Sequence, residues 1–80
     1  MDIVDQALNA IEYLEQVRDK NDQNYGVVTS IDNRIGPIRT YVNHIARKRA
    51  SGEEPIETIA VLRSLLDSDE YLSTWRKQND

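Results

Sequence analysis

The residues with the most evident chemical potential lie in the stretch RIGPIRTYVNHIARKR, residues 34–49, which carries five basic residues and no acid. Arg34, Tyr41 and Lys48 recur every seven residues, so on a helix they share one edge, with His44 nearby. An aromatic ring between cations can stack on a base while the cations bind phosphate. The basic residues at the end of the stretch would also oppose the helix dipole, and the pattern favours this structural interpretation.

A second charged feature is acidic and lies in the first quarter of the chain. On a helix, five carboxylates fall within about 100° of arc beside the apolar face. We call this set the acidic ridge: Asp5, Glu12, Glu15, Asp19 and Asp22. It could bind a basic partner or lie alongside the basic residues of the following helix, and we expect the second arrangement. The edge of Arg34, Tyr41 and Lys48 would then face either solvent or this ridge.

Catalysis is the function that the composition supports least. Nucleophile and base pairs usually include a histidine, and the chain has one histidine and no cysteine. His44 lies roughly 140° from the centre of its apolar helix face, so we expect an exposed structural residue. The sequence therefore predicts that the protein is not an enzyme.

Metal binding has little more support. The chain lacks both cysteine ligands for zinc and the Glu-x-x-His pairs of di-iron bundles. Glu12 and Glu15 are one turn apart and could hold Mg²⁺ in a helical hydrolase, but a second carboxylate pair on a facing helix is not evident. We expect these two residues to form a solvated flank, with no metal and no cofactor.

The bulk composition describes one small acidic domain over residues 1–80. The chain is 39% hydrophobic and 30% charged, with a net charge of −4. Residues 33–52 contribute +5, which leaves −9 for the remainder. Such a molecule is repelled by nucleic acid as a whole, so only a local and salt-sensitive patch could bind it.

The cellular location is expected to be the cytoplasm. The chain has no cysteine for a disulfide, and its first residues lack a basic leader. No apolar run approaches the roughly 18 residues that a membrane span needs. Neither secretion nor membrane insertion is predicted.

Apolar periodicity predicts an all-α bundle of three to four helices, near residues 2–22, 29–50, 55–66 and 68–77. The apolar residues of the first segment cover roughly 180° of arc, which is wider than one neighbouring helix requires. This segment is expected to contact two helices or a second subunit. A homodimer or a docked partner helix follows as a hypothesis.

Several residues are candidates for the ends of these helices. Gly26 is expected as a C-cap residue, and Thr29 as the N-cap of the second helix. Gly52 is expected to end that helix, and Asp67 to cap the last one through a capping box with Glu70.

The pair Gly36-Pro37 leaves two alternatives open for the second helix. Proline removes a helical hydrogen bond and disfavours helical dihedrals at the preceding residue. The segment is therefore either one kinked helix over 29–50 or two helices, the second beginning at Pro37. The apolar stripe keeps its phase across the pair, which favours the kinked helix.

Together these features predict a small cytoplasmic protein-interaction module, an adaptor, inhibitor or regulator, that binds a macromolecular partner without catalysis. The runner-up is a regulator that binds nucleic acid through the local basic patch. A helix-turn-helix is disfavoured because the segment at 68–77 begins with acids where phosphate contacts would lie, and Trp75 is expected to be a packing anchor. The candidate partner-binding residues are Arg34, Tyr41, His44, Lys48, Glu12, Glu15 and Asp19.

Overall fold

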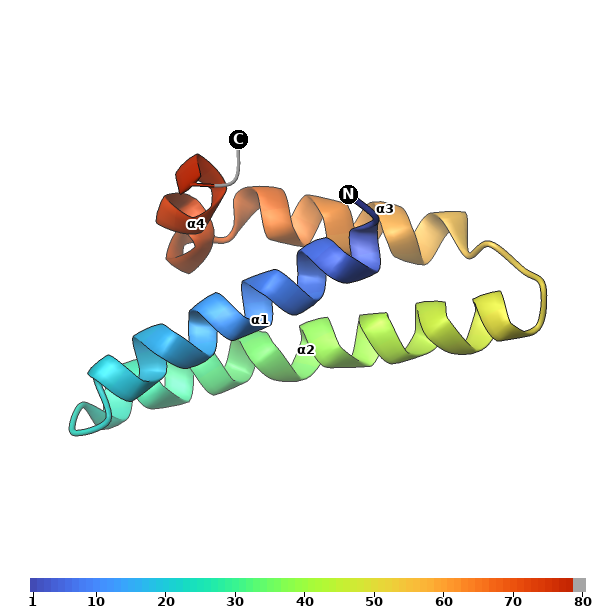
Figure 1. Ribbon diagram of the computed structural model, residues 1–80. Coiled ribbons are helices and arrows are strands. Elements are labelled where there is room, and N and C mark those ends of the chain that lie inside the picture. Colours follow the sequence, from blue (N-terminus) through green and yellow to red (C-terminus); the bar gives the residue numbers. More distant parts are fainter. Residues whose placement is uncertain (79–80) are drawn as a thin grey trace.

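The computed structural model describes residues 1–78, which form four α-helices and one short 3-10 helix (Figure 1). The elements are α1 (Ile3–Lys20), α2 (Tyr25–Ala50), α3 (Ile56–Ser68), the 3-10 helix η1 (Glu70–Leu72) and α4 (Ser73–Gln78). No strand occurs in this part of the chain. The predicted all-α bundle is confirmed.

The helices pack as an antiparallel bundle around α2, the longest element (Figure 1). α1 and α2 are joined by a tight turn and run in opposite directions, and α3 returns along α2 after a longer loop. α1 contacts α2, α3 and η1. Most of the broad apolar arc of α1 is therefore covered within the chain, although Leu8 in this arc is 48% exposed.

A single hydrophobic core joins all the elements. α1 and α2 each contribute five buried residues, while α3 contributes two and the C-terminal segment two more. These residues are Ile3, Ala7, Ala10, Ile11, Leu14, Ile31, Ile35, Ile38, Val42, Ile45, Leu62, Leu66, Leu72 and Trp75. The burial of Trp75 confirms its predicted role as a packing anchor.

The start of α2 differs from the prediction. Asn24 is the N-cap, and its side-chain oxygen accepts a hydrogen bond from the backbone N–H of Val27 at 3.2 Å. Gly26 and Thr29 lie inside the helix, so their predicted capping roles were wrong. The prediction failed because an asparagine four residues after the end of α1 is already a strong cap, and a short turn is enough to reverse the chain.

α2 continues through Gly36 and Pro37 without interruption, so the alternative of two separate helices was wrong. Ile35 and Ile38 are both buried. The apolar stripe of the helix therefore faces the core on both sides of the Gly36-Pro37 pair. Gly36 and Pro37 themselves are exposed. The carbonyl of Asn33, which would normally bond the missing N–H of Pro37, is on an exposed residue where water can solvate it.

The end of α2 was predicted correctly at Gly52, which has a φ of 82°. The N–H of Gly52 bonds the carbonyl of Arg49, and the N–H of Glu53 bonds that of Lys48. This is a Schellman arrangement, in which glycine adopts the left-handed conformation without a steric penalty.

The break after α3 falls later than predicted. Asp69 caps η1, its carboxylate accepting the N–H of Tyr71 at 2.8 Å, so the predicted capping role of Asp67 was wrong. Arg76 then donates to the carbonyls of Leu66 and Asp69 at 2.9 and 2.7 Å. These bonds satisfy carbonyls at the end of α3 and fold α4 back onto the bundle.

Candidate functional site

The basic edge predicted on α2 is largely used inside the molecule. Arg34 donates two hydrogen bonds to the Asp69 carboxylate at 2.8 and 3.1 Å, and its guanidinium lies 4.3 Å from the centre of the Tyr71 ring. It also donates to the carbonyl of Ser30 and approaches Glu70 at 3.4 Å. Arg34 therefore faces the C-terminal segment rather than solvent or the acidic ridge.

The other members of this edge differ in their surroundings. Tyr41 is half-buried and packs against the core. Lys48 forms an ion pair of 3.4 Å with Glu53 in the loop after α2. His44 is exposed, as the sequence predicted. The structure thus does not gather Arg34, Tyr41 and Lys48 into one open cationic surface.

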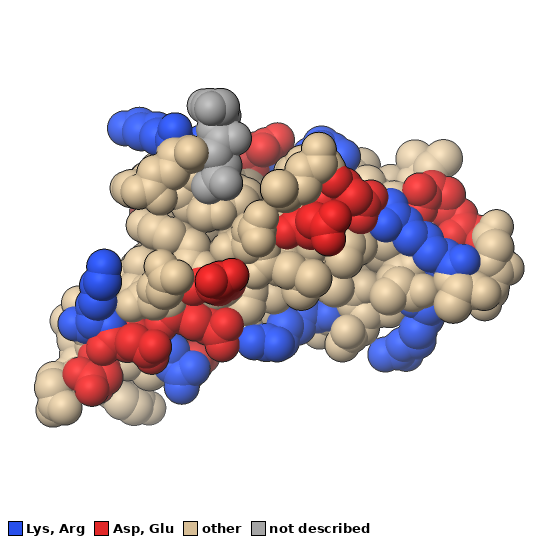
Figure 2. Space-filling model, in the orientation of Figure 1, with Lys and Arg blue, Asp and Glu red and all other residues tan. Residues whose placement is uncertain are grey.

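Four members of the acidic ridge lie on α1, whereas Asp22 lies in the turn after it, so its predicted place on the helix was wrong. Glu15 of the ridge pairs with Arg39 of α2 at 3.4 Å. Within residues 1–78, Glu12 and Asp19 form no ion pair. Figure 2 shows acidic side chains following α1 across this face, with basic side chains close beside them. The described part of the chain holds no group of three or more His, Cys, Asp or Glu residues placed to bind a metal ion.

Arg49 connects the start of the chain to the loop after α2. It donates to both carboxylate oxygens of Asp2 at 2.8 and 2.9 Å, and to Glu54 at 2.7 Å. The hydrogen bonds from Arg49 are the main reason that the pKa of Asp2 falls to about 2. The pKa of Arg49 is raised, mainly by its hydrogen bonds to Asp2 and to a smaller extent by those to Glu54. This cluster stabilises the ends of α1 and α2 and leaves Arg49 little freedom to bind a ligand.

The outer face of α3 is a surface that intrachain contacts leave open. Seven of the 13 residues of this helix are apolar, yet only Leu62 and Leu66 are fully buried. Ile56 is 73% exposed and Val61 is 50% exposed. α3 therefore leaves two large aliphatic side chains in contact with water on the side away from the bundle.

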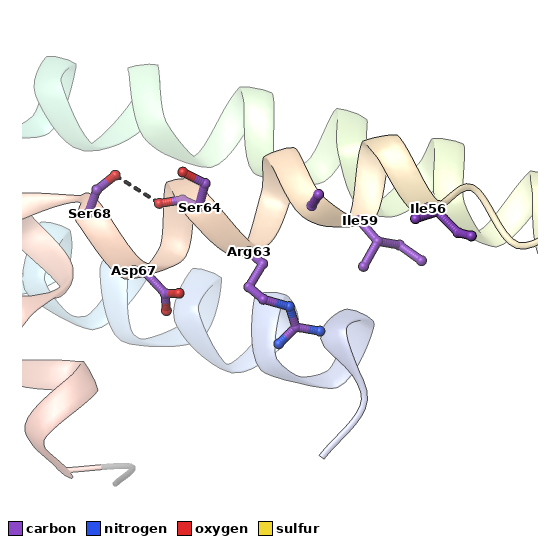
Figure 3. Close-up of a pocket in the computed structure, with 7 residues that line it drawn as sticks. Ile56, Ile59, Arg63, Ser64, Asp67 and Ser68 are labelled. Carbon is purple, nitrogen blue, oxygen red and sulfur yellow. Dashed lines mark hydrogen bonds between the residues drawn. The ribbon is translucent and has the colours of Figure 1, made fainter.

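An open groove follows this outer face (Figure 3). It is lined by Ile56, Ile59, Ala60, Arg63, Ser64, Asp67 and Ser68. Ser68 donates its hydroxyl to the carbonyl of Ser64 at 2.8 Å, so the Ser68 side chain is satisfied within the helix. A second hollow beside it includes Val61 and Leu65. The α3 outer face, defined by these two sets of residues, is therefore shallow and weakly polar.

The sequence interpretation missed this surface. Apolar periodicity predicted a helix near residues 55–66 but not which of its apolar residues the bundle would leave exposed. None of the seven candidate residues, from Glu12 to Lys48, lies on α3.

The chain matches no protein-family model, no curated protein and no solved structure. No helix within the described residues is long and apolar enough to span a membrane.

Proposed function

We propose that this protein is a cytoplasmic helical interaction module that binds another protein chain through the α3 outer face and acts as an adaptor, inhibitor or regulator without catalysing a reaction. The observation that carries the proposal is the exposure of Ile56 and Val61, 73% and 50%, on a helix in which only Leu62 and Leu66 are fully buried. Covering such a surface removes apolar area from water, which is favourable by about 25 cal/mol for each Å².

The character of the surface supports a protein partner. The groove combines exposed aliphatic side chains with small residues, and its rim carries one cation and one anion, Arg63 and Asp67. An apolar centre with a charged rim is typical of protein interfaces. A partner helix could lie along α3 with its own apolar side chains over Ala60 and Ser64.

Affinity capture with matched variants tests this proposal. Val61→Arg places a charge on the α3 outer face, while Thr40→Arg places the same charge on the exposed outer side of α2. We expect wild type and Thr40→Arg to retain the same protein from a native lysate, and Val61→Arg to lose it by tenfold or more in quantitative mass spectrometry. Equal retention by all three proteins, each shown by circular dichroism to be folded, would contradict the proposal.

A second candidate is nucleic-acid binding through α2. It is favoured by Arg47 and His44, which are exposed and form no ion pair within residues 1–78. Because Arg34, Lys48 and Arg49 have carboxylate partners, this patch offers few cations, and its binding would be weak and steeply salt-dependent. Fluorescence anisotropy with labelled DNA and RNA at low salt tests it, and no change on adding wild-type protein would exclude it.

A further inference from the structure

We infer that the joint between α3 and η1 is a two-state switch. The joint is bent in this structure, and when it straightens it passes the C-terminal segment, residues 70–78, to the same packing position on a second copy of the chain. The inference goes beyond the proposed function and does not use the α3 outer face. It rests on how little local structure separates α3 from the segment that follows.

A single residue, Asp69, separates α3 from η1. The N–H of Asp69 still bonds the carbonyl of Leu65 at 3.1 Å, as it would inside a helix, and its φ of −67° is helical. Only its ψ, 128°, is extended. A change of this ψ to about −42° would continue the helix. Residues 56–78 contain no glycine or proline that would prevent one continuous helix.

Side-chain contacts keep the joint bent. The Asp69 carboxylate accepts hydrogen bonds from the Tyr71 N–H and from Arg34, both at 2.8 Å. Arg76 donates to the carbonyls of Leu66 and Asp69. In a straight helix, the N–H groups four residues later would bond these two carbonyls instead. The straight joint therefore loses the cap and the Arg34 ion pair, but it leaves neither carbonyl without a partner.

The second copy is the partner because it offers a site that already fits this segment. Leu72 and Trp75 are buried against the bundle, which α4 crosses after the bend (Figure 1). Straightening would carry both side chains into water at the end of a helix about 34 Å long. Each straightened chain also vacates the place where these side chains pack. Two copies that exchange segments across a two-fold axis bury Leu72 and Trp75 again in the same surroundings.

A variant that favours the straight joint gives the first test. Asp69→Ala removes the cap and the partner of Arg34 from the bent form, and alanine is the better helix former. Because each dimer contains two joints, this variant should dimerise at least about tenfold more tightly than wild type. Sedimentation velocity measures the association, and circular dichroism shows whether the variant is folded.

Glu70→Pro is the opposite variant, because it blocks a continuous helix and preserves the bend. Proline is favoured at the first position of a helix, and Asp69 already has the extended backbone that a residue before proline requires. Glu70→Pro should stay monomeric, alone and in combination with Asp69→Ala. The matched control, Glu70→Ala, removes the same carboxylate and should associate at least as strongly as wild type.

A folded Asp69→Ala variant that stays monomeric would overturn the inference, as would a dimer that persists in Glu70→Pro. If Asp69→Ala does not fold, wild type decides. Concentrated wild-type protein returned from partial unfolding in urea should contain a dimer that dissociates slowly, and Glu70→Pro treated in the same way should not. No wild-type dimer would then overturn the inference.

The proposed function fails separately from this inference. Val61 lies on the α3 outer face, away from the contacts that the two copies exchange. Val61→Arg should therefore dimerise as wild type does, whether or not it loses a captured protein.

Discussion

At the scale of single residues, Arg34 joins the C-terminal segment to α2. Its guanidinium bonds a carboxylate that is only 9% exposed, while the arginine side chain itself is 24% exposed. Asp69 uses the same carboxylate to cap η1. The same carboxylate therefore both caps η1 and holds the segment after α3 to α2.

Replacing Arg34 by alanine should lower the free energy of unfolding by about 1–3 kcal/mol, because the Asp69 carboxylate loses its cation in a poorly solvated position. Arg39→Ala is the matched control. Its ion pair with Glu15 is 54% and 47% exposed, and such surface pairs contribute about 0–1 kcal/mol. Urea denaturation of both variants measures the difference. If both variants lost the same free energy of unfolding, the Arg34–Asp69 ion pair would contribute no more to stability than the exposed Arg39–Glu15 pair.

The Asp2 carboxylate should make folding stability depend on pH in acid. Its pKa in the folded protein is lowered to about 2, mainly by hydrogen bonds from Arg49. A lowered folded-state pKa favours the folded state above the ordinary carboxyl pKa, and this contribution disappears as pH falls through the folded-state value. The stability difference between wild type and Asp2→Asn should therefore be constant above about pH 4 and shrink between about pH 4 and pH 2.

Asparagine keeps the N-cap, so the Asp2→Asn variant removes only the charge. A difference that stays the same across this range would contradict the Arg49 contact.

For single residues, the sequence predicted the position of a side chain on its helix better than it predicted which residue that side chain contacts. The heptad spacing correctly placed Arg34 on an edge of the second helix. Its partner Asp69 lies 35 residues away, and periodicity within one helix contains no information about which loop will reach it.

At the scale of elements, the N-cap of α2 gives a clear prediction. Asn24→Ala removes the acceptor for the Val27 N–H and should cost about 1 kcal/mol. Thr29→Ala should cost less than about 0.5 kcal/mol, because this residue lies inside the helix, where alanine is the better helix former. Thermal unfolding followed by circular dichroism compares the two. If Thr29→Ala lost more stability than Asn24→Ala, the result would instead support Thr29 as the N-cap of this helix.

The existence of each helix could be predicted from apolar periodicity, whereas several of their ends could not. The segment from Asn21 to Thr29 offers several capping residues in succession, and local propensity hardly distinguishes them. The end of α2 at Gly52 was easier to predict, because the left-handed conformation that often ends a helix strongly favours glycine. Continuity through Pro37 was the favoured alternative because the apolar stripe keeps its phase across the pair, and Ile35 and Ile38 on its two sides are both buried.

At the scale of the whole molecule, the C-terminal segment completes a core that three helices share. Trp75 is 8% exposed and lies in the same cluster as Leu14 and Leu72. Trp75→Ala should cost about 3–5 kcal/mol, a large part of the stability of so small a domain. Tyr25→Ala, at a site that is 83% exposed, should change stability by less than about 0.5 kcal/mol. Urea unfolding measures the stability of both variants. If Trp75→Ala lost as little stability as Tyr25→Ala, α4 would not contribute to the core.

The candidate binding surface could not be predicted in the same way as the core. Sequence patterns show that 55–66 is rich in apolar residues but not which of them the bundle covers. That division depends on how α1, α2 and α3 pack, since α1 and α2 cover only the side with Leu62 and Leu66. The charged residues attracted attention in the sequence, yet most of the prominent cations pair within the chain.

Site-specific photo-crosslinking tests the central claim, that the α3 outer face binds protein, most directly. A photoreactive amino acid replaces Val61 in one protein and Thr40 in another, and each is irradiated in native lysate. The account predicts a discrete protein adduct from position 61 and none from position 40. Equal labelling from both positions, or no adduct from position 61, would contradict it.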